Sequence, residues 1–167
     1  MQLTAEQVLS FHLNGFLSLP TPITTEIELE TMRAAYDRIF EEKAGRDEGN
    51  QFDLGGADEE GKEESLPQIL NPAKYAPELR DGFFLESANS IVRQLLGPSV
   101  SAGVAHAIYK PAGKGAPTPW HQDEAYWDPA WQYQNVSIWM PLREATLGNG
   151  CLWFMPGSHE WPTLEHQ

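Results

Sequence analysis

His121 and Asp123 are the residues of this chain whose types and spacing best suit metal chemistry. On a β-strand, residues i and i+2 point to the same side, so an imidazole nitrogen and a carboxylate oxygen can reach one ion. A facial iron site takes a second histidine as its third protein ligand. The pair therefore predicts two of three iron ligands. The alternative is a loop histidine and aspartate that serve a turn or a cap.

The composition predicts one globular domain. The chain has 167 residues, of which 41% are hydrophobic, and this length suffices to bury a core. No apolar run approaches the roughly 20 residues of a membrane span, and the first residues lack the basic and apolar regions of a signal peptide. Cys151 is the only cysteine, so an internal disulfide is excluded. We therefore expect a cytoplasmic protein without a membrane partner.

The charge is strongly negative and uneven. A net charge of −13, from 24 acidic and 11 basic residues, argues against binding to a phosphate backbone, so nucleic acid is not an expected partner. Residues 41–64 hold ten of the acids against three bases, and five glycines interrupt them. Such a segment does not sustain a helix. We expect a solvated acidic loop there.

Residues 1–98 carry the signals of helices. Thr4-x-x-Gln7 and Thr25-x-x-Glu28 are capping-box patterns, each ahead of apolar residues at helical spacing. The predicted elements are a short helix after Thr4 that ends near Gly15, a strand at 16–19, a long helix along 29–40, and a helix along 85–96 that ends at Gly97.

From residue 99 the pattern changes to alternating and β-branched runs. These predict strands at 100–109, 135–140 and 151–155, with a hairpin turn at Asn149-Gly150. Helices first and strands afterwards favour an α+β fold with a mainly β core. Residues 1–98 would then be a helical support, and residues 99–167 the β part that carries the metal motif.

Several phrases of the second half occur in an order that is specific for one enzyme family. They are Lys110-Pro111, Trp120 to Trp127, Val136 to Leu142, Gly148 to Leu152 and Met155 to His159, preceded by the opening phrase Phe11 to Leu17. In these phrases the chain resembles the phytanoyl-CoA dioxygenase family of Fe(II)- and 2-oxoglutarate-dependent oxygenases.

The resemblance implies a fold and a set of roles. The fold is a double-stranded β-helix, or cupin-like jelly roll, with N-terminal helices, and residues 1–167 would be a single domain that lacks its C-terminal strands. The cofactors are Fe(II), 2-oxoglutarate and O2. The resemblance implies that His121 and Asp123 bind iron and that Trp139 lines the 2-oxoglutarate pocket. It implies that Lys110 contacts an acidic group of the cosubstrate or the substrate. Gln122, Tyr126 and Trp127 would lie near the substrate mouth.

The third iron ligand has no clear counterpart in this chain. The distal histidine of the family and the arginine that follows it, which pairs with the 2-oxoglutarate carboxylate, do not match any phrase here. His159 belongs to a Pro-Gly-Ser-His turn that lies near the site in the family but does not bind the metal. His166 stands one residue from Gln167, where a ligand has little support. We therefore expect impaired turnover from residues 1–167.

The leading functional hypothesis is a dioxygenase that hydroxylates a small organic or acyl substrate, present here as a fragment or a truncated form. The alternative is a non-catalytic binding or regulatory module that retains the jelly roll. A cupin-like hydrolase or isomerase would use the same ligand types but does not explain the family phrases. Missing strands would leave open sheet edges, so a homodimer through those edges is plausible. The substrate is not predicted.

Overall fold

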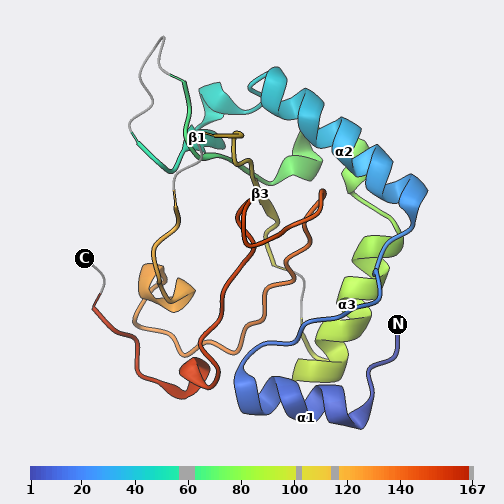
Figure 1. Ribbon diagram of the computed structural model, residues 1–167, viewed down its shortest axis with the longest axis vertical. Coiled ribbons are helices and arrows are strands. Elements are labelled where there is room, and N and C mark those ends of the chain that lie inside the picture. Colours follow the sequence, from blue (N-terminus) through green and yellow to red (C-terminus); the bar gives the residue numbers. More distant parts are fainter. Residues whose placement is uncertain (57–62, 101–102, 114–116, 166–167) are drawn as a thin grey trace.

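The computed structural model describes residues 1–56, 63–100, 103–113 and 117–165 (Figure 1). The helices are α1 (Ala5–Asn14), α2 (Glu26–Glu41) and α3 (Phe83–Leu96), and the strands are β1 (Gln51–Asp53), β2 (Pro67–Leu70) and β3 (His106–Ile108). Single turns of 3-10 helix occur at η1 (Arg46–Glu48), η2 (Pro72–Lys74), η3 (Pro77–Leu79), η4 (Asp123–Tyr126) and η5 (Ser158–Glu160). In Figure 1 the helices run along one side and the base, while most of the chain after β3 is extended. No helix among the described residues is long and apolar enough to cross a membrane.

The three predicted helices are confirmed, and local capping explains where they begin. The Thr4 hydroxyl accepts a hydrogen bond from the Gln7 amide at 3.1 Å, and the Gln7 side chain accepts one from the Thr4 amide at 2.8 Å. Gly15 ends α1 at a φ of 79°, a left-handed conformation in which glycine is favoured. Thr25 caps α2 in the same way through the Glu28 amide. These ends depend on residues within one turn, which is why the sequence predicts them.

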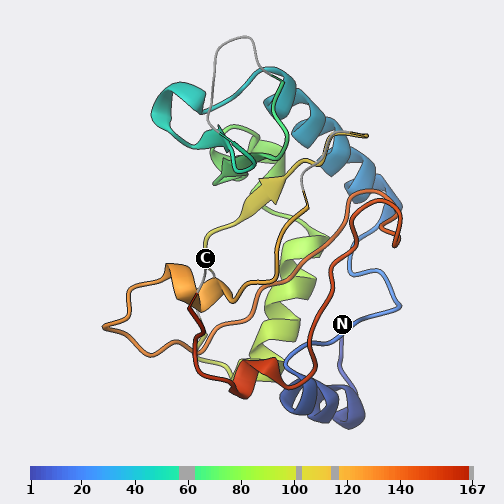
Figure 2. The same ribbon diagram turned by 60° about the vertical axis from the view of Figure 1, so that its left-hand side comes forward.

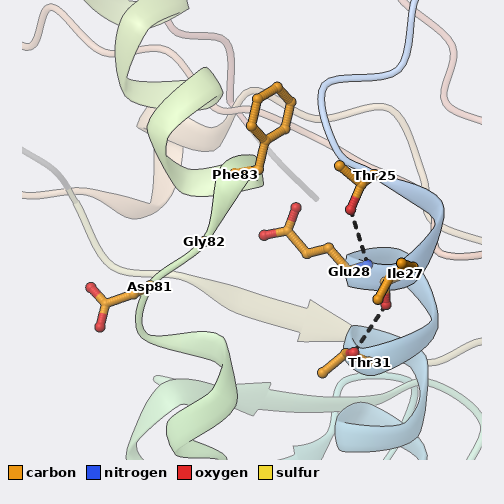
Figure 3. A pocket seen from close by; sticks show the side chains of 7 residues that line it. All are labelled: Thr25, Ile27, Glu28, Thr31, Asp81, Gly82 and Phe83. Carbon is orange, nitrogen blue, oxygen red and sulfur yellow. Dashed lines mark hydrogen bonds between the residues drawn. The ribbon is translucent and has the colours of Figure 1, made fainter.

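Glu28 does not complete the second capping box, because its carboxylate reaches another helix. Its two oxygens accept hydrogen bonds from the Phe84 amide at 3.0 and 3.1 Å, in the first turn of α3. The Thr24 hydroxyl donates to the same carboxylate at 2.5 Å. Figure 3 shows the Glu28 side chain directed from α2 toward Gly82 and Phe83. Since Gly82 offers no side chain to cap α3, a negative group from α2 satisfies that helix end.

We expect Glu28→Ala to lower the free energy of unfolding by about 1–3 kcal/mol, because the partly buried Phe84 amide loses a charged acceptor. Chemical denaturation of the two proteins measures the difference. Glu30→Ala is the matched control, since Glu30 is exposed on the same helix, and we expect it to change stability by less than about 0.5 kcal/mol. Equal stabilities of Glu28→Ala and the unaltered protein would contradict the capping role.

The sheet is antiparallel, in the order β1-β2-β3. Gln51 pairs with Ile69 and Asp53 with Pro67, while Ile69 also pairs with Ala107. The sequence did not predict β1 or β2. β1 falls inside the segment 41–64 that was predicted to be a solvated loop, so this prediction is wrong for the part that holds η1 and β1. The pairing partner, 14 to 18 residues away, makes this polar tripeptide a strand.

The Asp53 carboxylate fixes the connection between β1 and β2. It accepts hydrogen bonds from the amides of Gly55 at 2.9 Å, Ser65 at 2.9 Å and Leu66 at 2.7 Å. Burial by itself would raise the pKa of Asp53, but these donors, together with the Ser65 hydroxyl, lower it below the ordinary value of 3.8. The ionised carboxylate thus adds stability above about pH 4, which is lost as the pH falls through the lowered pKa.

Two buried clusters form the core, and the buried residues of both lie within residues 1–98. The first joins Ala35 and Ile39 of α2 to Ile69 of β2 and to Ala76. The second joins Leu3 to Ile91 and Leu95 of α3, with Ile138 packed against it. The face of the sheet that holds Ile69 and Ala107 therefore meets α2. Gln51 shares that face and is only 2% exposed, and its side-chain nitrogen and oxygen have no hydrogen-bond partner among the described residues.

The strand predictions for residues 16–19, 135–140 and 151–155 are wrong. Among the described residues these segments form no ladder, and of the predicted strand 100–109 only His106–Ile108 pairs, with 101–102 outside the described part. A strand needs a partner for its backbone groups, whereas alternation in sequence specifies only which side chains face inward. The predicted turn at 149–150 does form, with Gly150 at a φ of 98°.

Candidate metal site

His121 and Asp123 come together, although not on a strand. Gln122 between them is extended, with φ −116° and ψ 124°, and Asp123 begins the 3-10 turn η4. The motif thus lacks the strand geometry from which the pairing of these side chains was inferred. The imidazole Nε2 nonetheless lies 3.3 Å from the carboxylate Oδ1. An extended residue followed by a tight turn brings the two side chains to one side, as the strand spacing was expected to do.

A backbone carbonyl holds the ring of His121. Its Nδ1 lies 2.8 Å from the carbonyl oxygen of Pro119, and because a carbonyl oxygen can only accept, Nδ1 is the donor of this hydrogen bond. The other ring nitrogen, Nε2, lies 3.3 Å from the Asp123 carboxylate. A hydrogen bond from Nδ1 to a backbone carbonyl is the usual way in which a metal-binding histidine is oriented. The Pro119 contact therefore fits a histidine that offers Nε2 to a metal beside Asp123.

The distance between the two atoms fits a metal. Ligands about 2.1 Å from one ion at right angles lie about 3 Å apart, close to the separation of Nε2 and Oδ1. Both side chains are accessible, at 36% for His121 and 60% for Asp123. An ion could therefore enter and keep open positions for other ligands. These donors fit two of the three protein ligands of a facial Fe(II) site.

A third donor is not found in the part of the chain that the structure describes, where no group of three or more His, Cys, Asp or Glu side chains could hold an ion. His159 is directed to α1, where its Nε2 lies 3.0 Å from the carbonyl oxygen of His12. His106 lies on β3 and is exposed. His166 falls outside the described residues.

The three residues assigned to the substrate mouth lie around the pair in different ways. The Gln122 oxygen accepts from the Leu164 amide at 2.8 Å, and its nitrogen donates to the carbonyl of Pro162 at 3.3 Å. The Tyr126 ring lies 6.3 Å from the His121 ring, tilted by 59°. Trp127 packs edge-on against Tyr133 at 4.8 Å. Gln122 thus ties the C-terminal segment to the motif, and the Tyr126 ring lies near the imidazole ring.

Lys110 and Trp139, the residues assigned to 2-oxoglutarate, lie in separate segments. The Lys110 Nζ donates to the Thr118 hydroxyl at 3.3 Å, which brings Lys110 close to the segment that leads into His121. Trp139 lies in the extended segment after η4 and is 50% exposed. The roles of both residues remain predictions.

The sheet register places two further polar side chains on one face. Gln68 pairs with Ile108 and Leu70 with His106, so these four side chains share the face opposite Ile69. Gln68 is only 8% exposed. No pattern in the sequence signals Gln68, because β2 is too short for its alternation to be recognised.

Figure 3 shows a pocket that lies away from His121 and Asp123, between the first turns of α2 and α3. Its charged lining residues are Glu28 and Asp81. Glu28 already accepts hydrogen bonds from the Phe84 amide, so this pocket belongs to the helix contact rather than to the metal site.

Comparisons with known proteins match nearly the whole chain. The family model described as phytanoyl-CoA dioxygenase (PhyH) matches residues 11–167. A phytanoyl-CoA dioxygenase of Arabidopsis thaliana is 32% identical over 127 residues, which cover 73% of this chain and 41% of that protein. A probable alpha-ketoglutarate-dependent hypophosphite dioxygenase of Stutzerimonas stutzeri is 28% identical over 102 residues, covering 61% of this chain and 35% of that protein.

One solved structure is similar along the described fold. EvdO2 from Micromonospora carbonacea var. aurantiaca, solved in complex with 2-oxoglutarate, is 37% identical, with a TM-score of 0.75. The match covers 98% of this chain and 66% of the EvdO2 chain. The chain spans about two fifths of the length of the curated relatives that it matches in Arabidopsis thaliana and rice.

Proposed function

The chain belongs to the phytanoyl-CoA dioxygenase family of Fe(II)- and 2-oxoglutarate-dependent dioxygenases, and from this premise we propose that residues 1–167 carry the metal-binding part of a hydroxylase. Its substrate would be a small organic or acyl molecule. Its fold would be the first part of a jelly roll, an assignment supported by the antiparallel sheet and by the similarity to EvdO2.

The observation that carries the proposal is the contact between Nε2 of His121 and Oδ1 of Asp123. These two atoms, 3.3 Å apart, with the imidazole held by the Pro119 carbonyl, form a preorganised half-site for a divalent cation. Imidazole with carboxylate is the ligand set of non-haem Fe(II) oxygenases.

The surrounding residues would serve the cosubstrate and the substrate. Fe(II), when bound with 2-oxoglutarate, supplies the activation of O2 that hydroxylation needs. His121 and Asp123 would hold the ion. Lys110 would place a positive charge near the acidic end of 2-oxoglutarate, and Trp139 would line the same pocket.

The substrate would meet Gln122, Tyr126 and Trp127. Gln122 stands between the two metal-binding residues in sequence, and the Tyr126 ring lies beside the His121 ring. Tyr126 is 70% exposed, so its ring offers an apolar surface next to the metal. Trp127 is partly covered by Tyr133 and would form the outer wall of the mouth.

The second candidate is a binding or regulatory module without turnover. The part of the chain that the structure describes favours this candidate, because no third metal donor accompanies His121 and Asp123 there. Such a module would bind metal and 2-oxoglutarate weakly and release no succinate.

Anaerobic calorimetry of 2-oxoglutarate with residues 1–167 tests the proposal. We expect binding to the Fe(II)-loaded protein and none to the metal-free protein. Lys110→Ala should weaken the binding of 2-oxoglutarate by about 10-fold, because the cosubstrate loses one exposed or partly exposed charge contact. Arg143→Ala is the control, because Arg143 faces Asp37 of α2 at 3.5 Å.

Succinate release under O2 separates the two candidates. We expect little or none from residues 1–167, since a third ligand is not among the described residues. Binding of 2-oxoglutarate that is equal with and without Fe(II) would refute the cosubstrate site. Robust succinate release would refute the expectation that a further part of the domain is needed.

A further inference from the structure

Gln122, the residue between His121 and Asp123, is engaged at both ends of its side-chain amide. The oxygen accepts a hydrogen bond from the Leu164 amide at 2.8 Å, and the nitrogen donates to the Pro162 carbonyl at 3.3 Å. One side chain therefore ties the metal motif to backbone that lies 40 and 42 positions further along the chain. In Figures 1 and 2 the segment that follows η5 passes beside η4, in agreement with this contact.

The Gln122 contact lies behind the metal-binding pair. Gln122 is extended, with φ −116° and ψ 124°. Successive side chains of an extended backbone point to opposite sides, so His121 is directed away from the side on which Gln122 is held. Asp123 lies on the His121 side, because its Oδ1 is 3.3 Å from Nε2. Gln122 thus holds the motif from the rear and leaves the other side to an ion.

The backbone of Gln122 also fixes the turn that carries Asp123. Its carbonyl oxygen accepts a hydrogen bond from the Ala125 amide at 3.0 Å, at the start of η4. On the other side of the motif, the Pro119 carbonyl holds Nδ1 of His121. Gln122 connects the held ring to the turn, so the position of its backbone determines where both metal-binding side chains lie.

The segment that Gln122 grips is itself anchored, through η5 and α1. The His159 Nε2 lies 3.0 Å from the carbonyl oxygen of His12, and the Gly157 amide donates to the Asn14 carbonyl at 2.9 Å. α1 in turn packs against the buried cluster of α3. A side chain that is bonded to an anchored segment restrains its own backbone, which is how supporting residues keep a metal site in its productive geometry.

We propose that Gln122 is a positioning residue for the metal site: through residues 162 and 164 it holds the backbone that directs His121 and Asp123 at one ion. The inference rests on the proposed function, because the ion is the one assigned there. The loss of outer contacts that orient metal ligands typically weakens metal binding by about 10- to 100-fold. A substrate contact of Gln122 would use its stem or its backbone, since both ends of its amide are engaged.

Anaerobic calorimetry of Fe(II) with residues 1–167 tests this role. Gln122→Met keeps the length of the side chain but removes both hydrogen bonds, and should weaken Fe(II) binding by about 10-fold. Leu164→Pro removes the amide that donates to Gln122, and should also weaken it. If the two changes act through one contact, the double variant binds Fe(II) as Gln122→Met does. Leu164→Ala is the matched control: it keeps the amide and should change the affinity by less than about 3-fold.

Hydrogen exchange of the Leu164 amide tests the contact without metal. Gln122→Met should speed this exchange by about 5-fold, the effect of losing one hydrogen bond, while the amides of α2 keep their rates. Exchange that rises equally in α2 would mean that the variant loosens the whole fold, and would overturn the positioning role.

Two calorimetric results would also overturn it: an Fe(II) affinity that Gln122→Met leaves unchanged, or losses that multiply in the double variant. A chain that binds Fe(II) equally before and after Gln122→Met refutes only the positioning role. An unaltered chain that binds no Fe(II) refutes the proposed function and this role together.

Discussion

Asp123→Ala lowers the affinity of residues 1–167 for Fe(II) by at least about 100-fold, because the loss of a direct ligand costs more than the 10- to 100-fold loss typical of outer-shell changes. The Asp123 oxygen lies 3.3 Å from Nε2 of His121, and alanine leaves a single imidazole there. His121→Ala has a similar effect. Anaerobic calorimetry with Fe(II) measures both.

The controls for this prediction come from the same neighbourhood. Glu124 is the next residue and is exposed, so Glu124→Ala removes an equal charge without removing a donor to the site. His12→Ala removes an exposed histidine from α1. Each should change the Fe(II) affinity by less than about 3-fold, the range of weak charge effects at the surface. If Asp123→Ala and Glu124→Ala behave alike, the affinity reflects general negative charge and the metal assignment fails.

Ile39→Ala lowers the free energy of unfolding by about 2–5 kcal/mol, the cost of emptying a buried site of this size. Ile39 is fully buried in α2 and packs with Ala35, Ile69 and Ala76. It therefore joins the helix to the sheet that leads into the metal motif. Urea denaturation followed by circular dichroism measures the loss.

Ile27→Ala tests whether burial causes this effect. Ile27 lies on the same helix and is 80% exposed, so the same substitution should change stability by less than about 0.5 kcal/mol. Comparable losses in the two variants would mean that helix propensity, and not packing against Ile69, determines the stability. A changed denaturant slope would indicate that the compactness of the unfolded state had changed as well.

The helices could be predicted from the sequence because their ends depend on neighbours. Thr4 and Gln7 cap each other within one turn, and Gly15 ends α1 by its own conformation. The proximity of His121 and Asp123 could also be predicted, since they are two residues apart and their side chains lie 3.3 Å from each other although the backbone is not a strand; their role as metal ligands stays a prediction. The family phrases indicated the same function, and the comparisons confirmed the family.

The sheet could not be predicted in the same way. β1 is a polar tripeptide in an acidic segment, and it becomes a strand only because β2 returns beside it. In contrast, residues 135–140 alternate as a strand should but have no ladder partner among the described residues. Pairing is a property of two segments, and the pattern of one segment does not reveal whether the other is present.

The sequence by itself determined both ends of α1, the start of α2, the acidic character and the His and Asp of the candidate metal site, because each depends on composition or on residues within one turn. Only the tertiary structure decided that Glu28 caps α3, that the Pro119 carbonyl holds the ring of His121, and that the buried core lies within residues 1–98. These features depend on how the backbone folds and on which segments lie side by side. Residue spacing leaves both undetermined.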